Sequence, residues 1–243
     1  MKKIFSACFL SLFLLSLVTS SGLSQEASDI LKKMVEAQGG KKVLEKIEDM
    51  TSTGNLEMIQ MGMSGSVTIY KKEPNKMRMD IEVMGMIITQ AFDGETAWWV
   101  NPQTGSKEEM PEQQQEDMKR MGLGIDAFIY PEKYGISYAF KGKEKIEEKE
   151  YLVLEQTFDD GHKATVYVDP KTYLTYKTKS TTMNPMGVEV ETETFESDFK
   201  KVNGMIIAYS IVILQDGEEF MKLTLTDITL NTGLEDSFFK MSE

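Results

Sequence analysis

The chain has 243 residues, with 41% hydrophobic residues and a net charge of −12 at pH 7. This length suits one domain, or a domain with an embellishment. So acidic a surface repels phosphate backbones and anionic lipid heads, which excludes nucleic acid as an expected partner.

The first 24 residues have the pattern of a secretory signal peptide. Lys2 and Lys3 precede an apolar run over residues 7–18 that is too short to span a bilayer, and Gly22 and Ser24 suit the −3 and −1 positions of a cleavage site. We therefore expect a signal peptide over 1–24, a single domain over 25–243, and a soluble periplasmic protein without a transmembrane anchor. Loss of the two lysines lowers the net charge from −12 to −14.

Cys8 is the only cysteine, and it lies inside the predicted leader. A lipid anchor on Cys8 is not expected, because the hydrophobic segment follows this cysteine and should precede it. The predicted mature chain then has neither a disulfide nor a thiolate, so its stability must come from its core.

Next along the chain, apolar residues recur with a period near 3.6 from Ile30 to Ile47, which predicts helix. Gly39 and Gly40 interrupt the pattern. We expect two amphipathic helices, Ala27–Gln38 and Lys41–Ile47, with Ser28 as the N-cap of the first.

After Met50 the period changes to two. Apolar or Thr side chains alternate with mostly charged ones in three segments, 77–83, 164–168 and 188–194. Turn signals separate such segments: Pro74-Asn75, Asp93-Gly94, Asn101-Pro102, Asp159-Asp160-Gly161, Asp169-Pro170, Asn203-Gly204 and Asp216-Gly217. These patterns predict a meandering antiparallel sheet, wetted on one side, that could curl into a barrel or half-barrel.

One polar stretch, Ser106–Gly122, interrupts the strands. Pro111 suits the first turn of a helix, and Met118 and Met121 could form its apolar edge. We expect a short helix over Pro111–Met121. It could be a lid over the sheet or a solvated surface helix.

The sequence offers little for catalysis. The only histidine, His162, follows a turn and is expected to be exposed, and there is neither a phosphate-binding glycine loop nor a set of zinc ligands. Carboxylates are plentiful, so a pair of glycosidase type stays open as an alternative. The expectation is that the protein is not an enzyme and has no cofactor and no metal.

Three Met-x-Met pairs occur close together: Met61/Met63, Met77/Met79 and Met84/Met86. On a strand each pair would place two thioethers on one face, and thioethers can bind Cu(I). The alternative is a flexible apolar lining, either plain core or a binding cavity. Because no His or Cys supports a copper site, the lining is preferred.

Several stretches resemble the LolA-like family of outer-membrane lipoprotein-sorting proteins. They are 74–79 (PNKMRM) with 90–105 (QAFDGETAWWVNPQTG), 166–174 (VYVDPKTYL) with 199–204 (FKKVNG), and 234–239 (LEDSFF). The resemblance extends over most of the predicted mature chain. It implies a fold that is α+β but mainly β: one curved antiparallel sheet, an unclosed half-barrel, with helices covering its concave face.

The role of this family gives an expectation for the function of the chain. The resemblance implies a periplasmic carrier or binding protein for lipoprotein acyl chains or another hydrophobic ligand, whose partner is a lipidated protein or a hydrophobic small molecule. The alternative is an envelope interaction or sensor domain of the same fold, which contacts other envelope proteins.

The alternation in 77–83 also predicts the lining of a hydrophobic cavity. Met77, Met79, Ile81 and Val83 are expected to face the concave side, while Arg78, Asp80 and Glu82 face water. Trp98 and Trp99 are both candidates for the same lining, but adjacent residues of a strand point to opposite faces, so only one of them can contribute.

Overall fold

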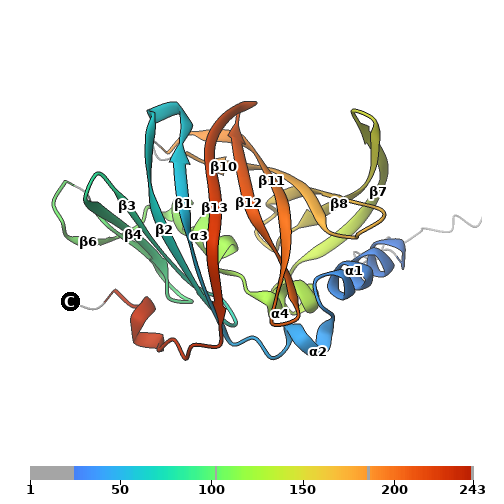
Figure 1. Ribbon diagram of the computed structural model, residues 1–243, viewed down its shortest axis with the longest axis horizontal. Coiled ribbons are helices and arrows are strands. Elements are labelled where there is room, and N and C mark those ends of the chain that lie inside the picture. Colours follow the sequence, from blue (N-terminus) through green and yellow to red (C-terminus); the bar gives the residue numbers. More distant parts are fainter. Residues whose placement is uncertain (1–24, 102, 185–186, 242–243) are drawn as a thin grey trace, which may run out of the picture.

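The computed structural model describes residues 25–101, 103–184 and 187–241 (Figure 1), so the predicted leader 1–24 and Cys8 lie outside the described residues. The helices are α1 (Gln25–Ala37), α2 (Lys41–Leu44), α3 (Glu112–Gly122) and α4 (Ile125–Ile129), with the 3-10 turns η1 (Ile59–Met61), η2 (Pro131–Tyr134) and η3 (Asp236–Phe239). None of these helices has the length and apolar composition needed to cross a membrane.

The strands all belong to one sheet. They are β1 (Asp49–Met58), β2 (Met63–Lys72), β3 (Lys76–Val83), β4 (Met86–Phe92), β5 (Ala97–Val100), β6 (Lys107–Glu109), β7 (Ser137–Ile146), β8 (Lys149–Thr157), β9 (Lys163–Val168), β10 (Thr175–Met183), β11 (Glu189–Val202), β12 (Met205–Gln215) and β13 (Glu218–Leu230).

The order of the 13 strands is β6-β5-β4-β3-β2-β1-β13-β12-β11-β10-β9-β8-β7, and β1 and β13 join the two halves of the chain. The edge strands β6 and β7 each have one neighbour, so the sheet is an unclosed half-barrel (Figure 1). The chain passes from one edge to the other through α3, α4 and η2. The predicted fold class is confirmed.

The helices lie on the inside of this curved sheet. Helix α3 contacts β3, β4 and β5 and also β10, although five strands separate β3 from β10 in the sheet. One helix can reach both groups only across the concave side. Helix α1 packs on the same face, where Ile30 and Met34 meet Leu154 and Val166. We call this side the inner face and the opposite side the outer face.

The strand turns follow the chemistry that the sequence predicts. The β11–β12 turn has Asn203 at φ 48° and Gly204 at φ 97°, and the β12–β13 turn has Asp216 at φ 49° and Gly217 at φ 83°. Two successive residues with positive φ match the right-handed twist of the strands they join. These two turns are therefore tight hairpins, as predicted.

The structure has a helix at each of the three predicted places, but the bounds of these helices differ from the predicted ones. The first helix begins at Gln25, the first described residue, so the N-cap predicted at Ser28 is wrong. The second ends at Leu44 and not at Ile47, and Pro111 is the N-cap of α3. Helix α3 is a lid over the inner face. The pattern did not predict α4.

Two glycines allow close approach of neighbouring strands in the strongly bent middle of the sheet. Gly54 adjoins a register shift between β1 and β13, and a Cβ there would lie 2.5 Å from the Thr224 carbonyl oxygen. A Cβ on Gly65 of β2 would lie 2.0 Å from the Glu82 carbonyl oxygen. Both distances are prohibitive for a side chain, so these positions require glycine.

Candidate functional site

The inner face can be followed across the sheet through its strand register, because directly paired residues of antiparallel strands point to the same side. Met79 pairs with Ile69, and Ile81 pairs with Val67 and Ile88. Met77 pairs with Phe92, which packs in one cluster with Met118 of α3. The structure thus places the set Met77, Met79, Ile81 and Val83 on the inner face, beneath the helices.

These four side chains differ in exposure. Met77, Ile81 and Val83 are buried, with 3%, 7% and 4% of their surface exposed, whereas Met79 is half-buried. Met79 shares this partial exposure with other apolar side chains of the inner face. We call this group the inner trough: Ile69, Met79, Ile88, Ile211 and Met221. These side chains pack against the buried cluster and leave part of their apolar surface accessible, which is typical of a binding site for a hydrophobic ligand.

The two tryptophans lie on opposite faces. Trp99 pairs with Gln90, the partner of Met79, and it packs against the inner cluster of Phe92 and Met118. Trp98 points outward, is 1% exposed, and donates a hydrogen bond of 2.7 Å from its Nε1 to the Phe239 carbonyl oxygen. Trp98 therefore cannot line an inner cavity, and Trp99 is the tryptophan on that side.

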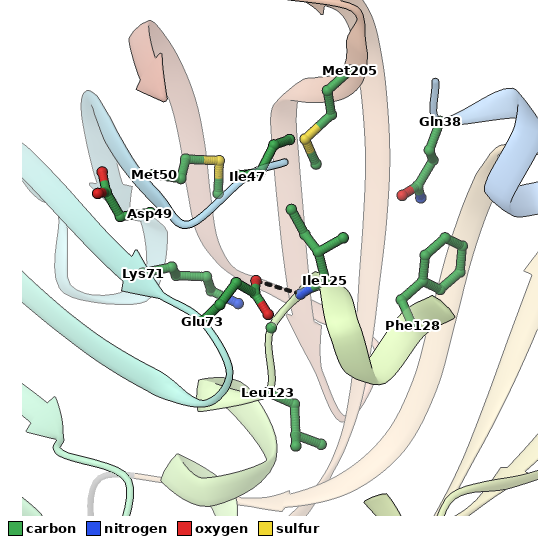
Figure 2. Close-up of a pocket in the computed structure, with 11 residues that line it drawn as sticks. Gln38, Ile47, Asp49, Met50, Lys71, Glu73, Leu123, Ile125, Phe128 and Met205 are labelled. Atoms are coloured by element: carbon green, nitrogen blue, oxygen red, sulfur yellow. Dashed lines mark hydrogen bonds between the residues drawn. The ribbon is translucent and has the colours of Figure 1, made fainter. Parts of the chain in front are cut away.

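A partly open cavity of about 200 Å³ lies at the α4 end of the inner face (Figure 2). Its apolar lining comes from β1, β12, α4 and the segments before β1 and α4: Ile47, Met50, Leu123, Ile125, Phe128 and Met205. Sequence reasoning missed this cavity because its residues come from five separate segments. Its floor is continuous with the predicted set, since Met50 pairs with Lys71 and Lys71 with Met77.

Two charged residues close one side of the cavity. The Glu73 carboxylate accepts a hydrogen bond of 2.7 Å from the backbone N–H of Ile125 (Figure 2) and one of 3.1 Å from that of Asp126, which fixes the start of α4. The Lys71 ammonium donates to the Met121 carbonyl oxygen at 3.0 Å. Burial raises the pKa of Glu73 and lowers that of Lys71. Both residues therefore hold the α3–α4 connection against the end of β2.

The C-terminal segment covers the outer face of β2–β5. The Asp236 carboxylate bridges Lys72 and Lys76, with both N–O distances at 2.7 Å, and the Phe238 ring lies 4.4 Å from the Arg78 guanidinium. On the same face Asp80 accepts a hydrogen bond of 2.7 Å from Thr89 Oγ1. The expectation that Asp80 faces water is wrong, because this carboxylate is part of a half-buried polar cluster.

The remaining sequence predictions have mixed outcomes. His162 is half-buried with its ring 5.7 Å from that of Phe158, so the prediction of an exposed side chain is wrong. Burial, followed by the charge of Arg120, lowers the pKa of His162. Met118 of α3 is buried, but Met121 is 48% exposed and does not belong to the apolar edge.

The three Met-x-Met pairs differ in their location and exposure. Only Met77/Met79 lies along the inner face. Met61 is 53% exposed, Met84 81% and Met86 59%. The interpretation as an apolar lining is therefore wrong for the exposed Met61, Met84 and Met86, whereas Met63 packs against the inner cluster. Among the described residues, no group of three or more His, Cys, Asp or Glu side chains could hold a metal ion.

No family model and no curated protein matches the sequence. Solved structures do match the fold. A LolA superfamily protein from Nitrosomonas europaea has a TM-score of 0.59 at 14% identity, over 88% of this chain and 97% of its own. A DUF1329 family protein from Desulfovibrio piger has a TM-score of 0.59 at 14% identity, over 88% and 96%.

A third structure comes from Vibrio parahaemolyticus and is provisionally described as an outer membrane lipoprotein-sorting protein domain. It has a TM-score of 0.58 at 15% identity, over 86% of this chain and 95% of its own. The chain therefore has a LolA-like fold, and at these identities the likeness establishes the fold alone.

Proposed function

We propose that this protein is a periplasmic carrier or binding protein that holds lipoprotein acyl chains, or another hydrophobic ligand, against the inner face of its half-barrel. The observation that carries the proposal is the inner trough, whose apolar side chains stay partly exposed on the inner face of the sheet. The LolA-like fold supports it, since a solved relative of this fold carries a lipoprotein-sorting description.

The size of the cavity beside α4 decides how a ligand would lie. Pockets for drug-sized ligands usually enclose about 300–1,000 Å³. The cavity beside Lys71 has about 200 Å³, so it is too small for a whole acyl chain. A bound chain would enter this cavity with one end and lie along the inner trough with the rest. Each buried methylene would contribute about 0.8 kcal/mol, enough for useful affinity with an ordinary acyl chain.

The proposal includes secretion through the predicted signal peptide. Secretion through a signal peptide over residues 1–24 would deliver the domain over 25–243 to the periplasm, where lipidated proteins are found in transit. Envelope fractions should then contain protein that begins at or near Gln25 and carries no acyl group. An intact leader, or lipid on Cys8, would contradict this part of the proposal.

Ligand binding can be tested directly on purified mature protein. Native mass spectrometry after mild purification should detect a co-purified lipid, and an environment-sensitive fatty-acid probe should bind. Met79→Asp would place a charge in the inner trough, and we expect it to abolish probe binding or folding. The matched control is Glu82→Ala, because Glu82 is on the same strand, exposed on the outer face.

The outcomes separate the candidate functions. Probe binding by wild type and Glu82→Ala, lost in folded Met79→Asp, supports the carrier. A clean apo mass together with no probe binding by folded wild type overturns it and favours an envelope interaction domain. The proposal includes no chemical step, and hydrolytic activity that disappears on replacing one buried carboxylate would contradict it.

A further inference from the structure

The inner face is not uniformly apolar. One apolar cluster lies under α1 on β7–β9, and the other covers β1–β3, β12 and β13. Between them, β10 and β11 present polar side chains to the inside. We call this set the polar stripe: Thr178, Ser180, Thr182, Thr192, Thr194 and Glu196.

Strand register places the polar stripe on the inner face. Thr178 pairs with Val166 of the α1 cluster on one side and with Thr194 on the other, and Thr194 pairs in turn with Ile213. Glu196 pairs with Ile211 of the inner trough, whose next partner is Leu223. The Glu196 carboxyl therefore lies beside the trough, at the border between hydroxyl and apolar side chains.

Glu196 differs from Glu191 and Glu193 of its strand. On the outer face, Glu191 pairs with Lys179 at 2.7 Å and Glu193 with Lys177 at 2.8 Å. Within the described part of the chain, no hydrogen bond or ion pair reaches the half-buried Glu196 side chain, and burial alone raises its pKa to about 7. Placing a carboxyl there without a partner costs stability, and such cost is often associated with a binding site.

The stripe also indicates the chemistry of its ligand. Hydroxyl groups and a carboxyl accept hydrogen bonds, and the stripe contains no cation that would bind an anionic head group. The nearest lysine on the strand, Lys200, contacts Asp198 at 2.9 Å and lies 4.2 Å from the Tyr209 ring centroid. Lys71, at the α4 end, bonds to the Met121 carbonyl oxygen.

We infer that the polar stripe binds the polar end of an amphipathic ligand that carries an amine, with Glu196 pairing the ammonium group and the hydrocarbon part lying on the inner trough. This inference rests on the proposed function, because it assumes that the trough holds a hydrocarbon chain. It adds that the polar end of the ligand contacts β10 and β11, while the hydrocarbon part contacts the strands of the inner trough.

Two probes of equal chain length separate charge from hydrophobicity. Decylamine and decanol both offer a hydrogen-bond donor, but only the amine is cationic at pH 7. We expect wild-type mature protein to bind decylamine about tenfold more tightly than decanol, as measured by competition with a fluorescent fatty-acid probe. Glu196→Gln should remove this preference and leave decanol binding unchanged.

The control is Glu193→Gln, which removes the same charge from the same strand on its outer face. It should keep the preference for decylamine, which excludes general attraction of a cation to an acidic protein. Equal affinity of wild type for both probes overturns the inference, as does a preference that persists in Glu196→Gln. If neither decylamine nor decanol displaces the bound fatty-acid probe, the inference is overturned, whereas failure of wild type to bind the fatty-acid probe overturns the proposed function itself.

Discussion

Two parts of the inner face differ in what covers them. On β8 and β9, Leu154 and Val168 are fully buried in the cluster beneath α1. On β3 and β12, Met79 and Ile211 carry equally apolar side chains on the same face but stay partly exposed. An inward apolar residue thus becomes core where a second layer lies over it and an accessible lining where none does.

The outer face shows the same contrast. The C-terminal turn η3 covers Trp98 of β5 and ion-pairs through its own Asp236 with two lysines of β2 and β3. A second layer of a few residues is enough to turn part of the outer surface into core. Substitutions should therefore affect stability in covered regions and ligand binding in the open one.

The largest expected effect is on stability in the region beneath α1. Leu154→Ala should lower the free energy of unfolding by about 2–5 kcal/mol, because it leaves a cavity in packed core. Urea denaturation measures this change, and folded Leu154→Ala should bind a fatty-acid probe as wild type does.

The matched variant in the open region is Ile211→Ala. It should cost less than half as much stability and should weaken probe binding about fourfold, the equivalent of one methylene at about 0.8 kcal/mol. If instead Leu154→Ala weakens binding and Ile211→Ala does not, the division into core and trough is wrong.

A smaller effect is expected at the two tryptophans. Trp98→Phe leaves the Phe239 carbonyl oxygen without its hydrogen bond and should cost about 1–3 kcal/mol. Trp99→Phe should cost less, because Trp99 is only half-buried. Fluorescence provides the second measurement: the change in tryptophan emission on probe binding should disappear in Trp99→Phe and persist in Trp98→Phe. The reverse pattern would place the ligand on the outer face.

The attachment of the C-terminal segment should depend on pH. Hydrogen bonds from Lys72 and then Lys76 lower the pKa of Asp236 from 3.8 to about 2. A lowered carboxyl pKa contributes stability above the unfolded value, which is lost as the pH falls through the folded one. Asp236→Asn should therefore destabilise the protein at pH 7, and its difference from wild type should vanish between about pH 4 and pH 2.

Glu235→Gln serves as the control for that experiment, since it removes the same charge from the neighbouring exposed residue. Denaturation followed by tryptophan emission in a Trp99→Phe background, where Trp98 is the remaining tryptophan, reports on the segment itself. A constant difference between Asp236→Asn and wild type across this pH range would show that the two lysines do not fasten the turn.

The smallest effect is expected for copper. Cu(I) should bind weakly or not at all, because Met77 is 3% exposed in the core and only Met79 of this pair is accessible. Titration against a competing Cu(I) chelator tests this expectation. Tight one-to-one binding by wild type that is abolished in Met77→Leu with Met79→Leu would show that the trough is a metal site.

The alternation of residue types and the turn signals predicted which side chains face inward and where tight turns lie in much of the sheet. The set from Met77 to Val83 faces inward as expected, and Asn203-Gly204 forms a tight turn as expected. Glu196 also had a visible signal, because it continues the even-numbered Val and Thr positions of 188–194 and not the odd-numbered glutamates. Extending this alternation from Thr194 to Glu196 would have predicted a carboxyl group on the inner face.

Other features left no local signal. Asp80 alternates with apolar neighbours as a solvent-facing residue would, yet Thr89 of the neighbouring strand β4 donates a hydrogen bond to it on the outer face. Helix α4 is only five residues long, and its start is held by Glu73, 52 positions earlier. Neither contact can be inferred from residues nearby in the sequence.

The amino-acid sequence by itself determined the period of each segment, the positions of the tight hairpins and the side of each strand that turns inward, because these depend on neighbouring residues. Only the tertiary structure decided which inward side chains became core, which tryptophan was buried, and which carboxyl was left unpaired. Those outcomes depend on what the curved sheet brings over each position, and α1, α3 and the C-terminal turn reach their partners across long stretches of chain.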